Sequence, residues 1–162
     1  MKNFKLTSES KIVFGVKLFR IECTIAFKGI AKGELGGWVE KEENLSGNAW
    51  VYGNAWVSGN AWVSGNARVS GDARVSGNAR AYGNARVYGD AFKTSPFQLQ
   101  GSVHFVCECK IGYLRIGCIE KPVKEWSVEF KNVGKIHGYT SSQIKEYGLY
   151  IELYSNLLKI KK

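Results

Sequence analysis

A six-residue repeat in the middle of the chain limits what this sequence can fold into. The tripeptide Gly-Asn-Ala or Gly-Asp-Ala occurs eight times at a spacing of six residues, starting at Gly47 and ending with the unit at Gly89. In most units a valine follows two residues after the alanine. Six residues are too few for a helix pair but suit one strand and one corner. Alanine and valine then share the inner face of a strand, and the glycine supplies the corner. The repeat therefore predicts a solenoid of short parallel strands.

One outward position of the repeat, between alanine and valine, changes from tryptophan to arginine along the chain. It holds, in order, Trp50, Trp56, Trp62, Arg68, Arg74, Arg80 and Arg86. If three units form one coil, residues 18 apart stack about 4.8 Å apart, like neighbouring strands. The expected columns are Trp38, Trp56, Arg74 and Phe92; Trp50, Arg68 and Arg86; and Asn44, Trp62, Arg80 and Gln98.

In this arrangement each column places a guanidinium over an indole, which is a favourable cation–π geometry. Arg68 and Arg86 become neighbouring like charges, which is unfavourable unless an anion lies beside them. Three interpretations stay open: a surface ladder, sides packed by symmetry mates or flanking segments, or a ligand groove in which arginine binds phosphate and an aromatic ring binds a base. The candidate ligand or partner surface is Trp50, Trp56, Trp62, Arg68, Arg74, Arg80, Arg86, Tyr52, Tyr82 and Tyr88.

The flanks of the repeat predict caps for the exposed ends of the coil. Residues 1–37 are expected to form a β cap, with a strand over 11–27 whose inward side chains are Phe19, Ile21, Cys23, Ile25 and Phe27. Residues 38–101 are expected to form the coil, disturbed near 93–96 where Lys93 occupies a valine position. Residues 102–162 are expected to form a β-hairpin and two helices. The inward side chains of that hairpin are expected to be Val103, Phe105, Cys107, Cys109, Leu114, Ile116 and Cys118.

The two expected helices have distinct apolar faces. The first begins near Pro122 and carries one stripe, and the second follows a capping box of Thr140 and Gln143. The second helix has an apolar seam of Ile144, Tyr147, Ile151, Tyr154 and Leu158 and a second flank of Leu149, Leu153 and Leu157. One neighbouring helix cannot cover both faces, so we expect the seam to form the interface of a homo-oligomer, with a trimer as the expected state.

The repeat resembles that of hexapeptide-repeat parallel β-helices, as in Val63-Ser64-Gly65-Asn66-Ala67. The resemblance implies a mainly β fold: a short triangular prism, left-handed, with three units per coil. "GELGGWVEKEENLSGNAWVYGNA", "YLRIGCIEKPVKEW" and "GKIHGYTSSQIKEYGLYIEL" are similar to the flanks of hexapeptide-repeat proteins encoded by phages and prophages. That likeness implies a setting in the cytoplasm of a bacterial host rather than an activity.

The sequence gives little indication of a catalytic site or a metal site. Many proteins of the resembled fold are acyltransferases with a histidine on the coil, whereas His104 and His137 both lie beyond the repeats. An acyltransferase-like protein is therefore the alternative, and a structural or polymerising β-helix is a third interpretation. Cys107 and Cys109 with Cys118 lack zinc-knuckle spacing and are expected to be buried thiols. We expect no bound metal and no cofactor.

The net charge of +9 favours anionic partners. Neither a signal peptide nor a membrane span is expected. The sequence therefore predicts a non-enzymatic, oligomeric binding or scaffold protein, whose partner is a host protein, such as a defence protein, or a nucleotide-like anion. Double-stranded DNA is not an expected partner.

Overall fold

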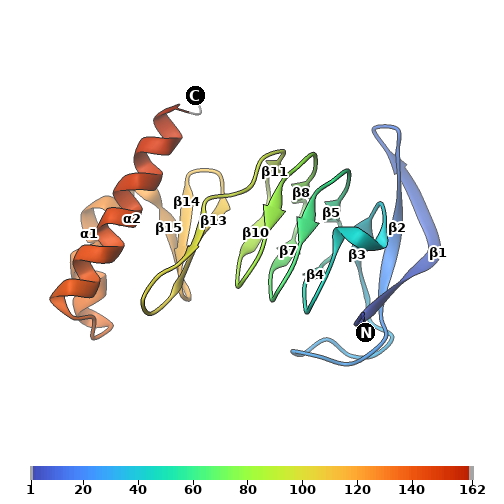
Figure 1. Cartoon of the computed structure of the whole chain (residues 1–162), viewed down its shortest axis with the longest axis horizontal. Coiled ribbons are helices and arrows are strands. Elements are labelled where there is room, and N and C mark those ends of the chain that lie inside the picture. Colours follow the sequence, from blue (N-terminus) through green and yellow to red (C-terminus); the bar gives the residue numbers. More distant parts are fainter. Residues whose placement is uncertain (1, 161–162) are drawn as a thin grey trace. The chain divides into compact units, whose positions relative to one another are not determined.

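A computed structural model describes residues 2–160 and divides the chain into two compact units, Met1–Pro96 and Phe97–Lys162. The first unit contains the strands β1 (Phe4–Val13), β2 (Val16–Cys23), β3 (Leu35–Val39), β4 (Trp50–Val51), β5 (Trp56–Val57), β6 (Trp62–Val63), β7 (Arg68–Ser70), β8 (Arg74–Val75), β9 (Arg80–Ala81), β10 (Arg86–Tyr88) and β11 (Ala91–Phe92), and a short 3-10 helix, Glu42–Asn44. The fold of this unit is a β-solenoid (Figure 1).

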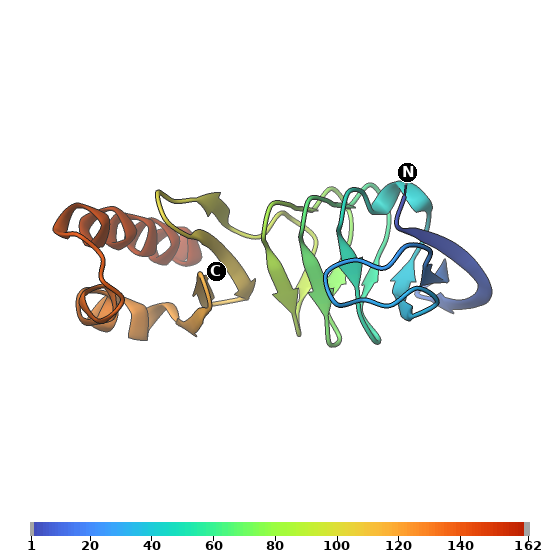
Figure 2. The ribbon, with the colours of Figure 1, turned by 90° about the horizontal axis from the view of Figure 1, so that it is seen from below.

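Three rows of parallel strands form the sides of the solenoid. The first side contains β3, β5, β8 and β11, the second contains β4, β7 and β10, and the third contains β6 and β9. Trp50 pairs with Arg68 and Arg68 with Arg86, so neighbouring coils are offset by 18 residues. The predicted coil of three six-residue units is therefore confirmed, and Figure 2 shows the stacked turns from another direction.

The interior of the coil is filled by the two apolar positions of each unit. The repeat alanines and valines are at most 3% exposed from Ala49 to Val87. At each repeat corner the glycine has a positive φ, between 56° at Gly53 and 76° at Gly89. Side chains with a Cβ rarely adopt this backbone conformation, which explains why glycine returns every six residues. Neighbouring corners are linked by asparagine ladders, as from Asn66 Nδ2 to Asn84 Oδ1 at 3.2 Å.

The last coil is one residue shorter than the sequence pattern predicts. Phe92 pairs with Val75 and is 5% exposed, whereas Lys93 is exposed. The prediction that Phe92 belongs to the outward column and Lys93 to the inward position is therefore wrong. The physical reason is that a lysine ammonium is costly to bury, so the chain shifts by one residue and places the phenyl ring inside.

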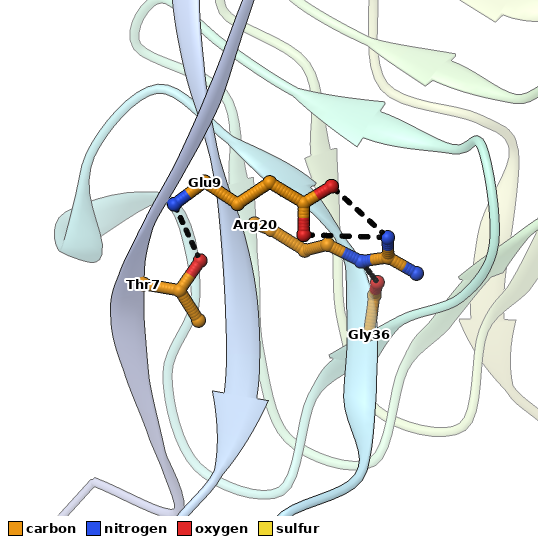
Figure 3. A network of polar contacts seen from close by, with 4 residues as sticks. All are labelled: Thr7, Glu9, Arg20 and Gly36. Carbon is orange, nitrogen blue, oxygen red and sulfur yellow. Dashed lines mark hydrogen bonds and ion pairs between the residues drawn. The ribbon is translucent and has the colours of Figure 1, made fainter.

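The N-terminal cap is a hairpin of β1 and β2 that extends the sheet of the first side. β2 pairs antiparallel with β3, and β1 is the outermost strand of this sheet. The strand β1 was not expected from the sequence. Arg20 ties the three strands together, since its Nε donates to the Gly36 carbonyl at 3.2 Å and its Nη1 contacts the Glu9 carboxylate at 3.3 Å (Figure 3).

The predicted alternation along β2 holds only in part. Ile21 and Cys23 are fully buried, as predicted. Before them Leu18 is buried and Phe19 is half-buried, and Ile25, beyond the end of β2, is exposed. The pairing of β2 with β3 is irregular between Arg20 and Glu22, and this irregularity changes which side chains face inward.

The second unit combines an antiparallel sheet with two helices. Its elements are β12 (Gln98–Gln100), β13 (Phe105–Lys110), β14 (Tyr113–Ile116), β15 (Ile119–Pro122), α1 (Val123–Ile136) and α2 (Ser141–Ile160). Gln98 pairs with Cys107 of β13 rather than stacking on the third side of the coil. The coil boundary predicted at residue 101 is therefore wrong, and the units divide after Pro96.

The core of the second unit lies between the sheet and the helices. Trp126 of α1 and Tyr147, Ile151 and Tyr154 of α2 are buried against side chains of β13 and β14. The predicted capping box is confirmed, because the Thr140 N–H donates to Gln143 Oε1 at 2.8 Å and the Gln143 N–H donates to Thr140 Oγ1 at 3.2 Å. Among residues 2–160, neither helix is both long and apolar enough to cross a membrane.

Four predicted side-chain orientations in this hairpin region are wrong. Val103, expected inside, is 40% exposed, and Val106, expected outside, is fully buried. Glu108, expected outside, is 2% exposed and accepts hydrogen bonds from the Tyr154 hydroxyl at 2.7 Å and the Phe97 N–H at 3.0 Å. Cys118, expected inside, is exposed because it lies in the turn between β14 and β15. A buried carboxylate is tolerated where such donors satisfy its oxygens.

Candidate functional site

The second side of the coil is covered by the segment of residues 24–34, which we call the covering segment. Trp50 of this side is only 1% exposed. The Phe27 ring of the covering segment meets the Trp50 indole edge-on, with ring centroids 5.8 Å apart at 78°. Figure 2 shows this segment as the light-blue loop lying across the coil. Of the three interpretations of this position, the one in which a flanking segment packs on the coil therefore describes Trp50.

Two basic side chains fasten the covering segment to the second side. Arg68 Nη2 donates to the Lys28 carbonyl at 3.2 Å, and the Lys28 ammonium donates to Asn66 Oδ1. The Arg68 guanidinium lies 5.7 Å from the centre of the Tyr52 ring. Arg68 is therefore placed over a tyrosine of the preceding coil, rather than over Trp50 as predicted. Arg86, the next residue of the column, is exposed.

The first side is partly covered by the β1–β2 hairpin. Trp38 is 8% exposed, and the Lys11 ammonium lies 4.2 Å from the centre of its ring. Burial, followed by repulsion from Arg20, lowers the pKa of Lys11. Trp56 is half-buried, and the exposed Arg74 lies over the Phe14 ring at 5.4 Å rather than over Trp56.

The third side carries the most exposed aromatic residues of the candidate surface. Trp62 is 40% exposed and Tyr82 is 45% exposed. The Arg80 guanidinium lies 5.9 Å from the centre of the Trp62 ring, which is the arginine-over-tryptophan arrangement that the sequence predicted. Asn44 of this side is buried and donates to the carbonyls of Gly59 at 3.2 Å and Ala61 at 2.8 Å.

The predicted surface is therefore distributed over three sides with different environments. Tyr52 and Tyr88 are half-buried on the second side, where Tyr88 pairs with Ser70. Arg68 and Arg86 are register partners on this side, so two cationic side chains follow one strip of the coil. We call Arg68 and Arg86 the basic strip. Lys28 lies over it in the covering segment, where its ammonium donates to the corner residue Asn66. The sequence analysis found the two arginines but missed Lys28, which has no place in the repeat.

The predicted oligomer interface lies largely inside the second unit. Tyr147, Ile151 and Tyr154 are 3%, 2% and 1% exposed, and Ile144 and Leu158 are half-buried. Tyr147, Ile151 and Tyr154 pack against the chain's own sheet and α1, so the prediction that these three residues form contacts between protomers is wrong, whereas that for Ile144 and Leu158 stays a prediction. The second flank is the face that α2 leaves uncovered, with Leu149 58% and Leu153 48% exposed.

The two histidines lie together in the second unit. His104 and His137 line a cavity of about 40 Å³ whose other walls include Trp126 and Tyr139. Burial, followed by the neighbouring Tyr147, raises the pKa of Tyr139 to about 12. The sequence analysis missed this cavity because the histidines are far apart along the chain. Its volume is well below that of a cavity that binds benzene, about 150 Å³.

Three of the four cysteines are buried free thiols, as expected for Cys107 and Cys109. Burial, followed by repulsion from Glu120, raises the pKa of Cys109 to about 12, so this thiol is not poised to react. Within residues 2–160, no group of three or more His, Cys, Asp or Glu residues has the geometry of a metal site.

Comparison with known proteins bears on the repeat region. A family model described as YdcK Beta solenoid repeat matches residues 49–65, 61–77, 67–83 and 73–89. The chain is a repeat-containing β-solenoid protein. The matched residues are those whose strands stack at an interval of 18 in the structure, so the family model and the strand register agree. No curated protein matches the chain.

Proposed function

We propose that this β-solenoid is a non-enzymatic binding protein whose basic strip holds an anionic, nucleotide-like ligand. One observation supports the proposal most: Arg68 and Arg86 are direct register partners on neighbouring parallel strands. Register partners on neighbouring parallel strands carry their side chains on the same side of the coil, where two like charges attract an anion. A phosphate group would accept charge-assisted hydrogen bonds from both, and the half-buried Tyr52 and Tyr88 offer rings for a base.

The proposal predicts binding that depends on both arginines. We expect cyclic oligonucleotides, ADP-ribose-type nucleotides or short single-stranded DNA to bind in titration calorimetry, more tightly at low than at physiological salt. Arg68→Gln combined with Arg86→Gln should lower the affinity at least tenfold, because charge-assisted bonds each contribute roughly 1.5–3 kcal/mol.

A matched control is Lys124→Gln with Lys135→Gln, which removes the same charge from two exposed side chains of α1. This control should leave the affinity within about twofold, since neither residue belongs to the basic strip. If the wild type binds none of these probes at low salt, the basic strip is not a nucleotide site, and a protein partner such as a host-defence protein takes its place as the proposal.

A catalytic role is not part of this proposal. His104 and His137 belong to the second unit and not to the coil, where the acyltransferases of the resembled fold carry their histidine. The likeness of the flanks to phage and prophage proteins leads us to propose the cytoplasm of a bacterial host as the setting.

We further propose that the protein is a homo-oligomer, with a trimer as the expected state, and that the second flank of α2 forms its interface. Leu149→Asp combined with Leu153→Asp should lower the mass measured by light scattering to that of one chain, because both side chains would place charges in an apolar contact. Val128→Asp is the control, since Val128 is an apolar side chain on α1 with 81% exposure. An unchanged mass in the double variant would remove α2 from the interface.

A further inference from the structure

The covering segment presents to the second side an aromatic ring and a hydrogen-bond acceptor oxygen, which are the two roles that the proposed ligand would fill. Its Phe27 ring meets the edge of the Trp50 indole, and its Lys28 carbonyl accepts a hydrogen bond from Arg68. A nucleotide would bring an aromatic base and anionic oxygens. The segment therefore occupies the basic strip in the manner of an internal ligand.

The Trp50 indole nitrogen is left without a partner under this segment. Among the buried side-chain polar atoms of the described residues, Trp50 Nε1 has no hydrogen-bond acceptor. A buried donor without an acceptor is unfavourable, and a ligand oxygen or ring nitrogen could supply the missing acceptor. This donor belongs to a fully buried side chain of the same column as Arg68 and Arg86.

The covering segment is held at its base and at its tip. Its first residue is anchored as well, because the Thr24 N–H donates to the Asn3 carbonyl at 2.9 Å. Cys23 and Glu34 close its base through a backbone hydrogen bond of 2.9 Å, and Phe27 and Ile30 close its tip through bonds of 3.1 and 2.8 Å. Between them, Lys28 and Gly29 both have positive φ, of 45° and 83°. The tip is thus a tight turn that depends on Gly29, whereas the coil beneath it is held by its own parallel strand pairing.

We propose that residues 24–34 form a lid that opens to admit a phosphate-bearing aromatic ligand, which replaces Phe27 at Trp50 and the Lys28 carbonyl at Arg68. This inference rests on the proposed function of the basic strip and adds its regulation: the free protein is held closed by its own lid. The apparent affinity equals the intrinsic affinity of the open form multiplied by the fraction of molecules that are open, so weakening the lid strengthens binding.

Two variants weaken the lid without changing its charge. Phe27→Ala removes the ring from Trp50, and Gly29→Ala places a Cβ at a left-handed residue where no atom lies within 4 Å, so only the backbone turn is affected. We expect each variant to raise the affinity for an ADP-ribose-type nucleotide roughly tenfold in titration calorimetry. Gly15→Ala is the matched control, because Gly15 also has a positive φ of 78° and no atom within 4 Å, but lies at the tip of the β1–β2 hairpin.

Hydrogen exchange gives a second readout that needs no ligand. Amides of residues 24–34 in the wild type should exchange faster than those of β4 and β7, and Gly29→Ala should accelerate only the lid. Exchange of the lid at the rate of the coil would overturn the inference, since the segment would then open only on unfolding.

The outcomes separate the lid from the site beneath it. Binding by the wild type with no gain in Phe27→Ala or Gly29→Ala overturns the lid and leaves the proposed function standing. Binding by the wild type, with a roughly tenfold gain in the two lid variants and no gain in Gly15→Ala, supports both. Absence of binding in all four proteins, with the coil still folded by circular dichroism, overturns both.

Discussion

Gly37→Ala should lower the free energy of unfolding of the first unit by about 3 kcal/mol, because the entry to the coil has no room for a side chain. A Cβ at Gly37 would lie 2.6 Å from the Ala55 carbonyl oxygen and 2.6 Å from Val51 Cγ1. The carbonyl is fixed, since it accepts the backbone hydrogen bond of Trp38 at 3.0 Å. Urea unfolding followed by circular dichroism measures the loss.

Gly15→Ala again serves as the control for this substitution. It introduces a Cβ into open space at a positive φ of 78°, so only backbone strain of about 1 kcal/mol is expected. Equal losses in the two variants would mean that the entry to the coil is not tightly packed, and would contradict the packing described here for β3.

Tyr154→Phe should destabilise the second unit by about 2–3 kcal/mol, because it removes a hydrogen bond to a buried carboxylate. The Tyr154 hydroxyl donates to Glu108 Oε1 at 2.7 Å and accepts from the Gly112 N–H at 2.9 Å. The control is Tyr150→Phe, which removes a bond of 2.9 Å to Glu146 near the surface and should cost within about 0.5 kcal/mol. A loss in Tyr154→Phe no larger than in this control would contradict the buried Glu108 network.

The same tyrosine is expected to make the second unit less stable at alkaline pH. Burial, followed by its hydrogen bond to Glu108, raises the pKa of Tyr154 above its ordinary value. A group whose pKa is raised on folding contributes stability below its unfolded pKa of about 10, and this contribution is lost as the pH rises toward the folded pKa. The wild type should therefore lose stability above about pH 10, and Tyr154→Phe should lose less over the same range. An equal loss in both proteins would exclude Tyr154 as a source.

The repeat made the coil predictable because its determinants are local. A glycine at each corner, a small inward alanine and an aliphatic partner fix the strand length, and the spacing of six fixes the register of Trp50 with Arg68 and of Arg68 with Arg86. Where a unit breaks this pattern, as at Lys93, the sequence marked the place of the disturbance. The shift by one residue was not predictable from the sequence. It depends on whether burying a lysine ammonium costs more free energy than moving a corner of the coil.

The environment of the candidate site was not predictable in the same way. Whether Trp50 is open or covered depends on where residues 24–34 fold back, and no periodic signal connects Phe27 to Trp50.

The orientation of Glu108 was predicted wrongly because β13 is buried on both faces: Cys107 and Cys109 are buried as well as Val106 and Glu108. Alternation of polar and apolar residues identifies the inner face of a strand only when the other face is exposed. The apolar seam of α2 was predicted correctly, but its buried residues pack within their own chain rather than against another protomer. An apolar stripe identifies a buried face and not the surface that packs on it.

Native mass spectrometry of protein purified from cells tests the central claim most directly, because it reports the bound ligand and the number of chains together. We expect an oligomer, with a trimer as the expected state, in which each chain of the wild type carries an added mass that matches a phosphate-bearing nucleotide. The same adduct should be absent from the variant with Arg68→Gln and Arg86→Gln. A wild-type protein that remains free of adduct even after incubation with an excess of the nucleotide probes, or an adduct retained unchanged in the double variant, would contradict the assignment of the basic strip as the binding site.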